Sequence, residues 1–247
     1  VVIVEVFFND LKRQFILNFI EKDRWKLMVT GLENTLKITI VAALIGIVIG
    51  ILLASIRSTY DKQYETLKKH KGVKYYVLRT LNFIAQIYLT VIRGTPVVVQ
   101  LLIAFFIIFA SAKNGVAIAM LAFGINSGAY VAEIFRGGIM AIDNGQFEAG
   151  YSLGFNYFQT MSFIVIPQVL KNVLPMLLNE FIALLKETSV AGYVAVTDIT
   201  RAGNVIRGTT FSPFMPLIAV ALFYLIMVMI LTQVVKRVER RLRKSER

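Results

Sequence analysis

The sequence contains no cysteine and only one histidine among its 247 residues. Without cysteine, disulfides, zinc–thiolate sites and thiol chemistry are excluded. The histidine, His70, lies in a segment rich in lysine, with no metal-ligating or nucleophilic constellation around it, and we interpret it as a solvated surface residue. The composition therefore gives no support to an enzyme that works through a thiol, an imidazole or a bound metal ion.

Acidic residues are also scarce: 15 Asp and Glu stand against 27 Lys and Arg, for a net charge of +12. Apolar residues make up 57% of the chain and the mean hydropathy is +0.68, whereas soluble domains have roughly 45–50% apolar residues. A soluble fold would leave large apolar patches exposed, so the composition predicts a protein solvated by a lipid bilayer. Nucleic acid would suit a basic soluble protein, but in a membrane protein cytoplasmic loops explain the excess of Lys and Arg. No nucleic-acid partner is predicted.

Long apolar segments predict an all-α integral membrane protein with five transmembrane helices. A helix needs about 20 mostly apolar residues to cross a bilayer. Five segments approach or meet this length: residues 36–56, 96–112, 115–135, 169–190 and 214–235. Residues 1–30 mix apolar and charged side chains, which predicts an amphipathic helix at the membrane interface. The chain is thus divided into an N-terminal segment, 1–30, and a transmembrane domain, 31–247.

The second apolar segment is interrupted by Arg93-Gly94-Thr95-Pro96. Thr95 is suited to cap a new helix and Pro96 to occupy its first position, where the missing N–H costs nothing. We therefore predict an amphipathic interfacial helix over 79–92, followed by a short span from residue 96. A continuous helix kinked at Pro96 is the alternative.

The distribution of Lys and Arg predicts the orientation of the chain, because cytoplasmic loops are enriched in both. Sixteen of them fall in a loop at 57–79, in the segment 136–171 and in the tail from residue 236, against eight in the segments on the other side. This bias places the N-terminus outside, the C-terminus inside, and the segment between the third and fourth spans in the cytoplasm.

That cytoplasmic segment begins Gly145-Gln146-Phe147-Glu148-Ala149-Gly150-Tyr151-Ser152-Leu153-Gly154 and ends Ile164-Val165-Ile166-Pro167. The pattern predicts a short helix with an acidic N-terminal side, a glycine break, and a second amphipathic helix halted by proline. Small residues at 149, 150 and 154 would let the surface of another protein come close. An ordinary amphipathic connector is the alternative.

The same segment resembles the EAA motif of ABC importer permeases, which reads Glu-Ala-Ala, three residues, Gly, nine residues, Ile-x-Leu-Pro. Five residues fall at the motif's positions: Glu148, Ala149, Gly154, Ile164 and Pro167. Gly150 replaces the second Ala and Ile166 replaces Leu, and both replacements keep the size or the apolar character. The resemblance implies a coupling helix that docks in a groove of an ATPase subunit.

Three further segments, 93–100, 126–138 and 178–189, resemble the polar-amino-acid (histidine, glutamine and arginine type) members of that family, and the resemblance extends from about Gly31 to Arg243. It implies a bacterial cell-membrane importer with two permease subunits, identical or closely related. It also implies two ATPase subunits, which carry the ATP and Mg, and an extracellular or periplasmic binding protein. The chain itself has no glycine-rich phosphate loop of the Walker type, and no cofactor of its own is predicted.

Ionisable groups inside membrane spans usually face the bundle interior or a wet cavity. Glu180 and Glu187 lie seven residues apart, on nearly one face of the fourth predicted span. An amino acid presents an ammonium and a carboxylate, so these carboxylates are candidates for binding the ammonium or a cationic side chain. The full set of candidate substrate contacts is Glu180, Glu187, Asn179, Gln100, Ser127 and Tyr130.

Several polar residues of these segments also have a structural interpretation. Small residues around Ser127 suit close helix packing in lipid, and Glu133 is spaced to pair with Arg136 on one helix. Arg93 could hold a substrate carboxylate, a lipid phosphate or a loop carbonyl. The two carboxylates favour a cationic substrate, while glutamine or another polar amino acid remains open.

Two rival classes account for the sequence less well. A secondary transporter would need coupling-ion sites and often an internal repeat, and no repeat is recognisable. An integral-membrane enzyme would need a catalytic constellation. Neither rival explains the segment 145–167.

Overall fold

The computed structural model of the chain describes residues 2–70 and 72–244. All regular elements within these residues are helical. The α-helices are α1 (Val2–Phe15), α2 (Trp25–His70), α3 (Val73–Gly94), α4 (Val97–Ile103), α5 (Gly115–Met140), α6 (Asn144–Ser152), α7 (Tyr157–Thr160), α8 (Ile166–Glu187), α9 (Ile199–Thr210) and α10 (Phe214–Lys244). Short π-helical or 3-10 turns join several of them: η1 (Ile16–Ile20), η2 (Glu21–Asp23), η3 (Ala104–Ile108), η4 (Met161–Val165) and η5 (Thr188–Val194).

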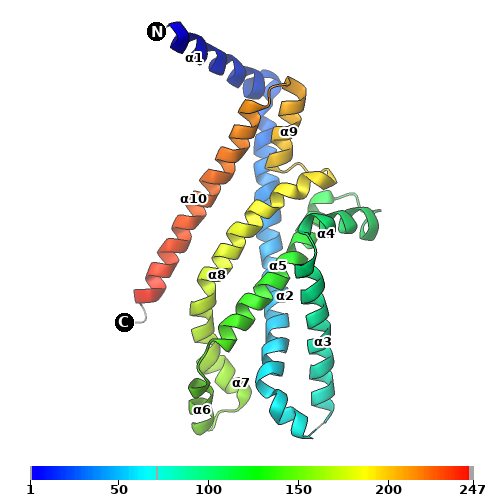
Figure 1. Cartoon of the computed structure of the whole chain (residues 1–247), viewed down its shortest axis with the longest axis vertical. Helices are drawn as coiled ribbons and strands as arrows, with labels where there is room; N and C mark the ends of the chain where they lie inside the picture. The colour runs from blue at the N-terminus through cyan, green and yellow to red at the C-terminus, as the bar shows by residue number, and fades with distance from the viewer. Residues whose placement is uncertain (1, 71, 245–247) are drawn as a thin grey trace.

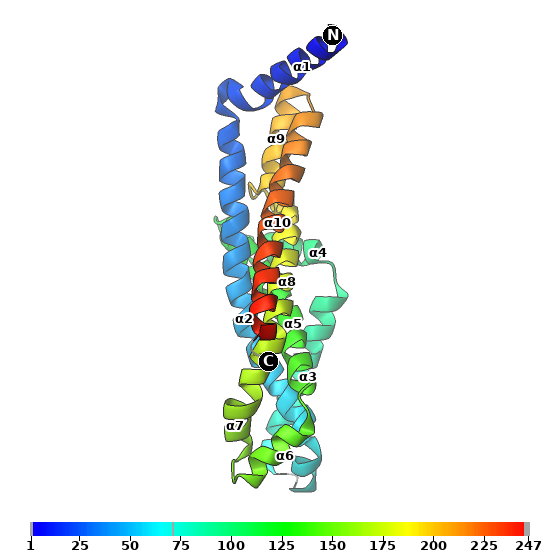
Figure 2. The same ribbon diagram turned by 90° about the vertical axis from the view of Figure 1, so that its left-hand side faces the viewer.

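The long helices run along the long axis of the molecule (Figures 1 and 2). Helices α1 and α9 lie at one end, and α6, α7 and the hairpin between α2 and α3 lie at the other. Four helical segments are long and apolar enough to cross a membrane: Trp25–Tyr64, Gly115–Met140, Tyr157–Val194 and Phe214–Leu242. A bent pair, Val73–Gly94 with Val97–Ile108, makes a fifth if it counts as one span. The predicted all-α membrane fold is confirmed.

The bent pair corrects the prediction for residues 79–112 in its details. The chain does break at Thr95–Pro96, by 107°, but α3 starts at Val73 rather than at residue 79. Thr95 does not cap α4: its hydroxyl donates to the carbonyl of Val91 at 2.8 Å. Pro96, in extended conformation, precedes the helix without a side-chain cap. A straight span over 96–112 is replaced by α4 and η3, which end at Ile108.

The prediction of a loop over residues 57–79 is wrong, because α2 continues to His70 and α3 begins at Val73. At about 1.5 Å per residue, the 46 residues of α2 extend over roughly 69 Å, much more than the roughly 30 Å of a bilayer core. The polar residues after Arg57 include good helix formers, and neither Gly nor Pro occurs before Gly72. A helical hairpin therefore projects beyond the apolar part of the bundle (Figure 1).

The N-terminal segment is helical and mixed in character, and α2 runs through residue 30 without a break. Helix α1 ends at Phe15, and the chain turns through η1 and η2, where Lys22 and Asp23 have positive φ. Helix α2 then starts at Trp25. The turn at residues 16–24 separates the N-terminal helix from the bundle.

Helices α2 and α5 form the closest packed pair of the bundle. Each has two glycines four residues apart, an arrangement that lets helix backbones approach in a membrane. The space where each glycine would carry a Cβ is taken by the other helix: Gly46 faces Ser127, Gly50 faces Val131, Gly124 faces Ile45 and Gly128 faces Ile49. The packing role predicted for the small residues near Ser127 is confirmed.

The end of the bundle that carries α9 is held together by buried polar groups. Asp198 is fully buried and caps α9 by accepting from the backbone N–H groups of Thr200 and Arg201 at 2.9 and 3.2 Å. Burial raises the pKa of the Asp198 carboxyl, and these hydrogen bonds oppose the rise. Thr35 of α2 accepts from the N–H of Ile199 at 3.2 Å, which fixes α2 against the start of α9.

Candidate functional site

The predicted coupling segment contains α6, a nine-residue helix with defined caps. Asp143 is its N-cap and accepts from the N–H of Gly145 at 2.6 Å. At the other end Gly154 has φ of +81°, and the N–H groups of Gly154 and Phe155 donate to the carbonyls of Tyr151 and Gly150 at 2.9 and 3.1 Å. This is the Schellman arrangement. The motif glycine at position 154 therefore ends the helix.

The second helix of the segment begins with a capping box, in which Asn156 and Gln159 each bind the other's backbone N–H at 2.9 Å. Contrary to the prediction, Pro167 does not halt this helix. The π-helical turn η4 leads directly into α8, and Pro167 lies in the first turn of α8, where a missing N–H is tolerated. One continuous helical segment, Tyr157–Val194, therefore leads from the candidate coupling region into the bundle.

Gly150 has a different role from the one predicted for the small residues. It is buried, and a Cβ at this position would lie 2.7 Å from Thr160 and 3.2 Å from Ile164. The close approach at Gly150 is thus between α6 and the start of the next helix of the same chain. Phe147 is buried beside it, in a cluster that includes Val165 and Val169.

The opposite side of α6 is exposed. Glu148 and Ala149 are exposed, Leu153 is 72% exposed, and Phe158 of α7 is 76% exposed. Helices α6 and α7, which carry these mixed apolar and acidic side chains, lie at one end of the molecule (Figures 1 and 2). Exposed large apolar side chains gathered in this way mark an interaction surface.

A second candidate site is an open cavity of about 530 Å³ between α3, α5 and α8, within the range of about 300–1,000 Å³ usual for small-molecule sites. It is lined by Arg93, Tyr130, Glu133, Ile134, Gly137, Gly138, Ala141, Asn172, Met176 and Glu180. Two of the predicted substrate contacts, Glu180 and Tyr130, thus share a cavity with carboxylate, guanidinium, phenol and amide groups.

Glu180 lies at the boundary between this cavity and a smaller apolar one of about 180 Å³ that it shares with Ser127. The hydroxyl of Ser127 donates to Oε1 of Glu180 at 2.9 Å, and Oε2 of Glu180 accepts no hydrogen bond from the described residues. Ser127 is buried. It therefore orients the carboxylate rather than lining the larger cavity.

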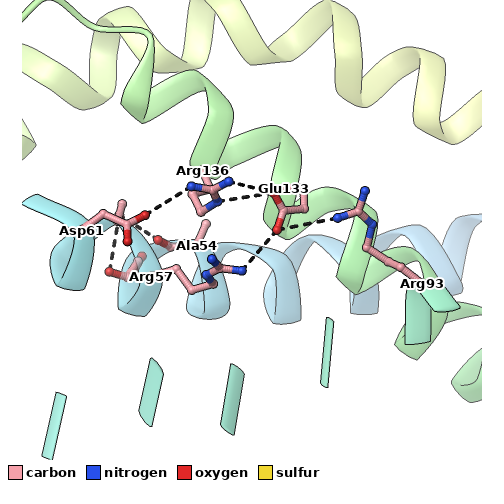
Figure 3. A network of polar contacts seen from close by, with 8 residues as sticks. Ala54, Arg57, Asp61, Arg93, Glu133 and Arg136 are labelled. Atoms are coloured by element: carbon pink, nitrogen blue, oxygen red, sulfur yellow. Dashed lines mark hydrogen bonds and ion pairs between the residues drawn. The ribbon is translucent and has the colours of Figure 1, made fainter. Parts of the chain in front are cut away.

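The side of the cavity formed by α5 carries a network of charged groups (Figure 3). Glu133 lies 3.4 Å from Arg57, 3.7 Å from Arg93 and 3.2 Å from Arg136. Arg136 also pairs with Asp61 at 3.2 Å. The predicted Glu133–Arg136 pair is confirmed, and the network joins α2, α3 and α5.

Among the described residues, Arg93 bonds neither to a loop carbonyl nor to the backbone at the break between α3 and α4. Its guanidinium carbon lies 5.8 Å from the centre of the Tyr130 ring, within the range of a cation–π contact. Its side chain is 46% exposed, against 16% for Arg57. Arg93 is thus the guanidinium of the network that is most open to the cavity.

Besides Ser127, three predicted substrate contacts do not line this cavity. Gln100 donates to the carbonyl of Ile92 at 2.8 Å and accepts from Asn126 at 3.0 Å, so its amide holds the break between α3 and α4. Asn179 donates to the carbonyl of Pro175 on its own helix at 3.1 Å. Glu187 lies about two helical turns beyond Glu180.

Three polar residues of the two sites were not singled out from the sequence: Asp61, Asn172 and Arg57. Arg57 and Asp61 fall in the segment taken for a loop, where they resemble solvated charges. Asn172 lies seven residues before Asn179 and eight before Glu180, about two helical turns, and this spacing was the available signal. Among the described residues, no group of three or more Asp, Glu and His side chains is arranged to hold a metal ion.

Comparison with known proteins finds permease subunits of transport systems. The chain is similar to the arginine transport system permease protein ArtQ of Bacillus subtilis (strain 168), with 36% identity over 87% of this chain and 92% of that protein. It is similar to the glutamine transport system permease protein GlnP of Escherichia coli (strain K12), with 34% identity over 88% and 93%.

A crystal structure of an amino acid ABC transporter with histidines superposes with a TM-score of 0.75 and 35% identity, over 87% of this chain and 94% of that chain. A methionine ABC transporter, MetNI, superposes with a TM-score of 0.74 at 20% identity and so shares the fold. The family model described as binding-protein-dependent transport system inner membrane component matches residues 46–244. The chain belongs to this family of ABC transporter permease subunits.

Proposed function

We propose that this permease subunit imports a polar or basic amino acid through the cavity between α3, α5 and α8. The observation that carries the proposal is the presence of Glu180 and Arg93 on one open cavity. A free amino acid has an α-ammonium and an α-carboxylate, so its site needs an acceptor for one and a donor for the other. The relatives named for arginine and glutamine transport support this class of cargo.

In this proposal Glu180 accepts the ammonium group, or a cationic side chain, through the oxygen that Ser127 leaves free. Arg93 meets the cargo carboxylate, because its exposed guanidinium is held at the cavity by Glu133 and Tyr130. Charge-assisted hydrogen bonds of this kind are stronger than neutral ones. Asn179 and Glu187 stay predicted contacts, and Gln100 takes the role of holding the α3–α4 break.

The same proposal assigns the exposed side of α6, around Glu148, to the ATPase subunit. Hydrolysis of ATP takes place on that partner, and its closure shifts the permease between two states through differential contacts at α6. Two permease subunits, as two copies or as this chain with a paralogue, enclose the path. An external binding protein delivers the cargo to the end that carries α9, with the N-terminus outside and the C-terminus inside.

The test of the cargo site uses the complete transporter, with its ATPase subunits and binding protein, in proteoliposomes. We expect Glu180→Gln to reduce the ATPase stimulation by arginine or glutamine about tenfold or more, since loss of a charge-assisted contact of about 1.5–3 kcal/mol corresponds to roughly 10–150-fold. Glu187→Gln and Asn179→Ala, measured in parallel, decide whether these residues take part.

Glu33→Gln is the matched control, because it also removes one carboxylate, on α2, where Glu33 pairs with Lys37 in an exposed position at 2.5 Å. It should leave stimulation unchanged. If Glu180→Gln responds to each amino acid as the unmodified transporter does, the cavity is not the cargo site.

A further inference from the structure

The hairpin of α2 and α3 reaches well beyond the membrane. The apolar run of α2 ends at Ile56, and the helix continues to His70. At about 1.5 Å per residue these last 14 residues extend over about 21 Å, whereas the headgroup layer on one side of a bilayer is only roughly 5–8 Å thick. Lys68 and Lys69 therefore lie roughly 10 Å outside the headgroups, about one Debye length at 0.1 M salt.

The hairpin ends at the same level as α6, the helix proposed to dock with the ATPase subunit. Both views of the molecule show the hairpin and α6 at one end, with the end of α10 nearer to the middle of the bundle (Figures 1 and 2). The basic tail of α10 starts at Lys236, directly after the apolar run, and is thus at headgroup level. The hairpin therefore lies at the level of α6, farther from the membrane than the tail of α10.

The hairpin is joined directly to α6. Lys62 of α2 donates to Oδ1 of Asn144 at 2.7 Å, and its ammonium lies 4.7 Å from the centre of the Phe147 ring. The preceding residue, Asp61, pairs with Arg136 near the end of α5. A protein that binds the exposed side of α6 therefore finds the hairpin alongside.

The exposed surface of the hairpin is basic, and an aromatic contact joins its two helices. Lys68, Lys69 and Lys74 are all exposed. The ring of Tyr64 of α2 contacts that of Tyr75 of α3, with ring centres 6.3 Å apart and the planes tilted by 40°. Aromatic contacts of this kind hold the two helices together, so the lysines are presented on an ordered element.

We propose that the α2–α3 hairpin is a second docking surface for the ATPase subunit, which meets Lys68, Lys69 and Lys74 with acidic side chains. This inference rests on the proposed docking of that subunit at α6. Distance favours the protein partner over anionic lipid headgroups, because the three lysines lie outside the headgroup layer. Charged groups at the rim of an interface mainly accelerate association and make it dependent on salt.

The experiment measures the association rate of the ATPase subunit that copurifies with the chain, binding to the permease in nanodiscs. K68E/K69E/K74E should associate about tenfold more slowly at about 0.1 M salt, and the difference should shrink at about 1 M salt. K68R/K69R/K74R should bind as the unmodified chain does. The neutral variant K68Q/K69Q/K74Q should fall between them, which keeps the test decisive if the reversed variant does not fold.

R237E/R240E/R241E is the matched control, because it reverses three exposed charges at headgroup level on α10. It should change the association rate less than about twofold. Glu148→Lys separates this inference from the proposal on which it rests. If Glu148→Lys slows association and K68E/K69E/K74E does not, the hairpin inference is overturned and α6 remains the docking site.

If neither variant has an effect, both proposals are overturned. If K68E/K69E/K74E binds the ATPase subunit normally but copurifies with less phosphatidylglycerol, the lysines bind lipid headgroups and the inference is also overturned. A slower, salt-dependent association with unchanged lipid content supports the hairpin as a docking surface.

Discussion

Replacing Glu133 by glutamine removes the carboxylate around which three guanidinium groups gather, at almost no change in volume. The most buried of the three pairs is Arg57–Glu133 at 3.4 Å, with side chains 16% and 23% exposed. At an effective dielectric constant of about 20, two charges at this distance attract by roughly 5 kcal/mol before desolvation is subtracted. Truncating one partner of a buried pair costs about 3–5 kcal/mol, and an exposed pair contributes about 0–1 kcal/mol.

The half-buried network lies between these limits, so we expect Glu133→Gln to lower stability by about 2–3 kcal/mol. In that variant the charge of Arg57 remains half-buried without the Glu133 carboxylate, and the Nε of Arg57 already lacks a hydrogen-bond partner. Arg93→Gln should cost less than about 1 kcal/mol, because the Arg93 side chain is 46% exposed and its contact with Glu133 is longer, at 3.7 Å.

Thermal unfolding of the detergent-solubilised chain measures both effects. A loss of about 2–3 kcal/mol corresponds to a midpoint lower by roughly 5–10 °C for a chain of this size. In the double variant Arg57→Gln/Glu133→Gln the loss should be smaller than the sum of the two single losses by about 1–2 kcal/mol, since the stranded charge is gone. If Glu133→Gln costs no more than Arg93→Gln, or if the double variant is additive, the reasoning on the network is refuted.

Two further predictions concern the ends of helices. Gly154 has φ of +81° and ends α6, so Gly154→Ala should destabilise the chain by about 1 kcal/mol. The same variant should transport fewer molecules per ATP hydrolysed. An unchanged melting midpoint would contradict this prediction. For Asp198, burial holds the folded-state pKa above the ordinary 3.8, so the contribution of its carboxyl to stability is highest below pH 3.8 and falls as the pH rises through the folded pKa. Asp198→Asn should remove that pH dependence and keep the cap. Asp198→Ala should lower stability by about 1–2 kcal/mol, measured by thermal unfolding at pH 7. Equal effects of the two variants would count against capping.

Hydropathy and motif spacing were sufficient to predict the membrane class and the short helix that ends at a glycine in the segment 145–154. The apolar run at 36–56 falls within α2, and the motif residues 148–154 fall on α6 with its glycine stop. These features depend on local composition and on backbone conformations that only a few residue types adopt. They can therefore be predicted from a single sequence.

The contacts between segments distant in the sequence could not be predicted in this way. Arg57 lies 76 residues before Glu133, and nothing in its local sequence distinguishes it from a solvated loop cation. The polar end of α2 was taken for a loop because hydropathy reports where a helix leaves the membrane, not where it ends. Gly150 was assigned to an external contact because sequence does not show which side of α6 packs against Thr160.

Coupling through α6 is the central claim, and the number of amino-acid molecules transported per ATP hydrolysed tests it most directly. The measurement uses the complete transporter in proteoliposomes, with Glu148→Lys compared with Glu33→Gln. We predict that Glu148→Lys keeps the chain inserted and lets ATP hydrolysis continue while transport per ATP falls steeply, and that Glu33→Gln behaves as the unmodified chain does. An unchanged ratio for Glu148→Lys would contradict the assignment of α6 to the ATPase subunit.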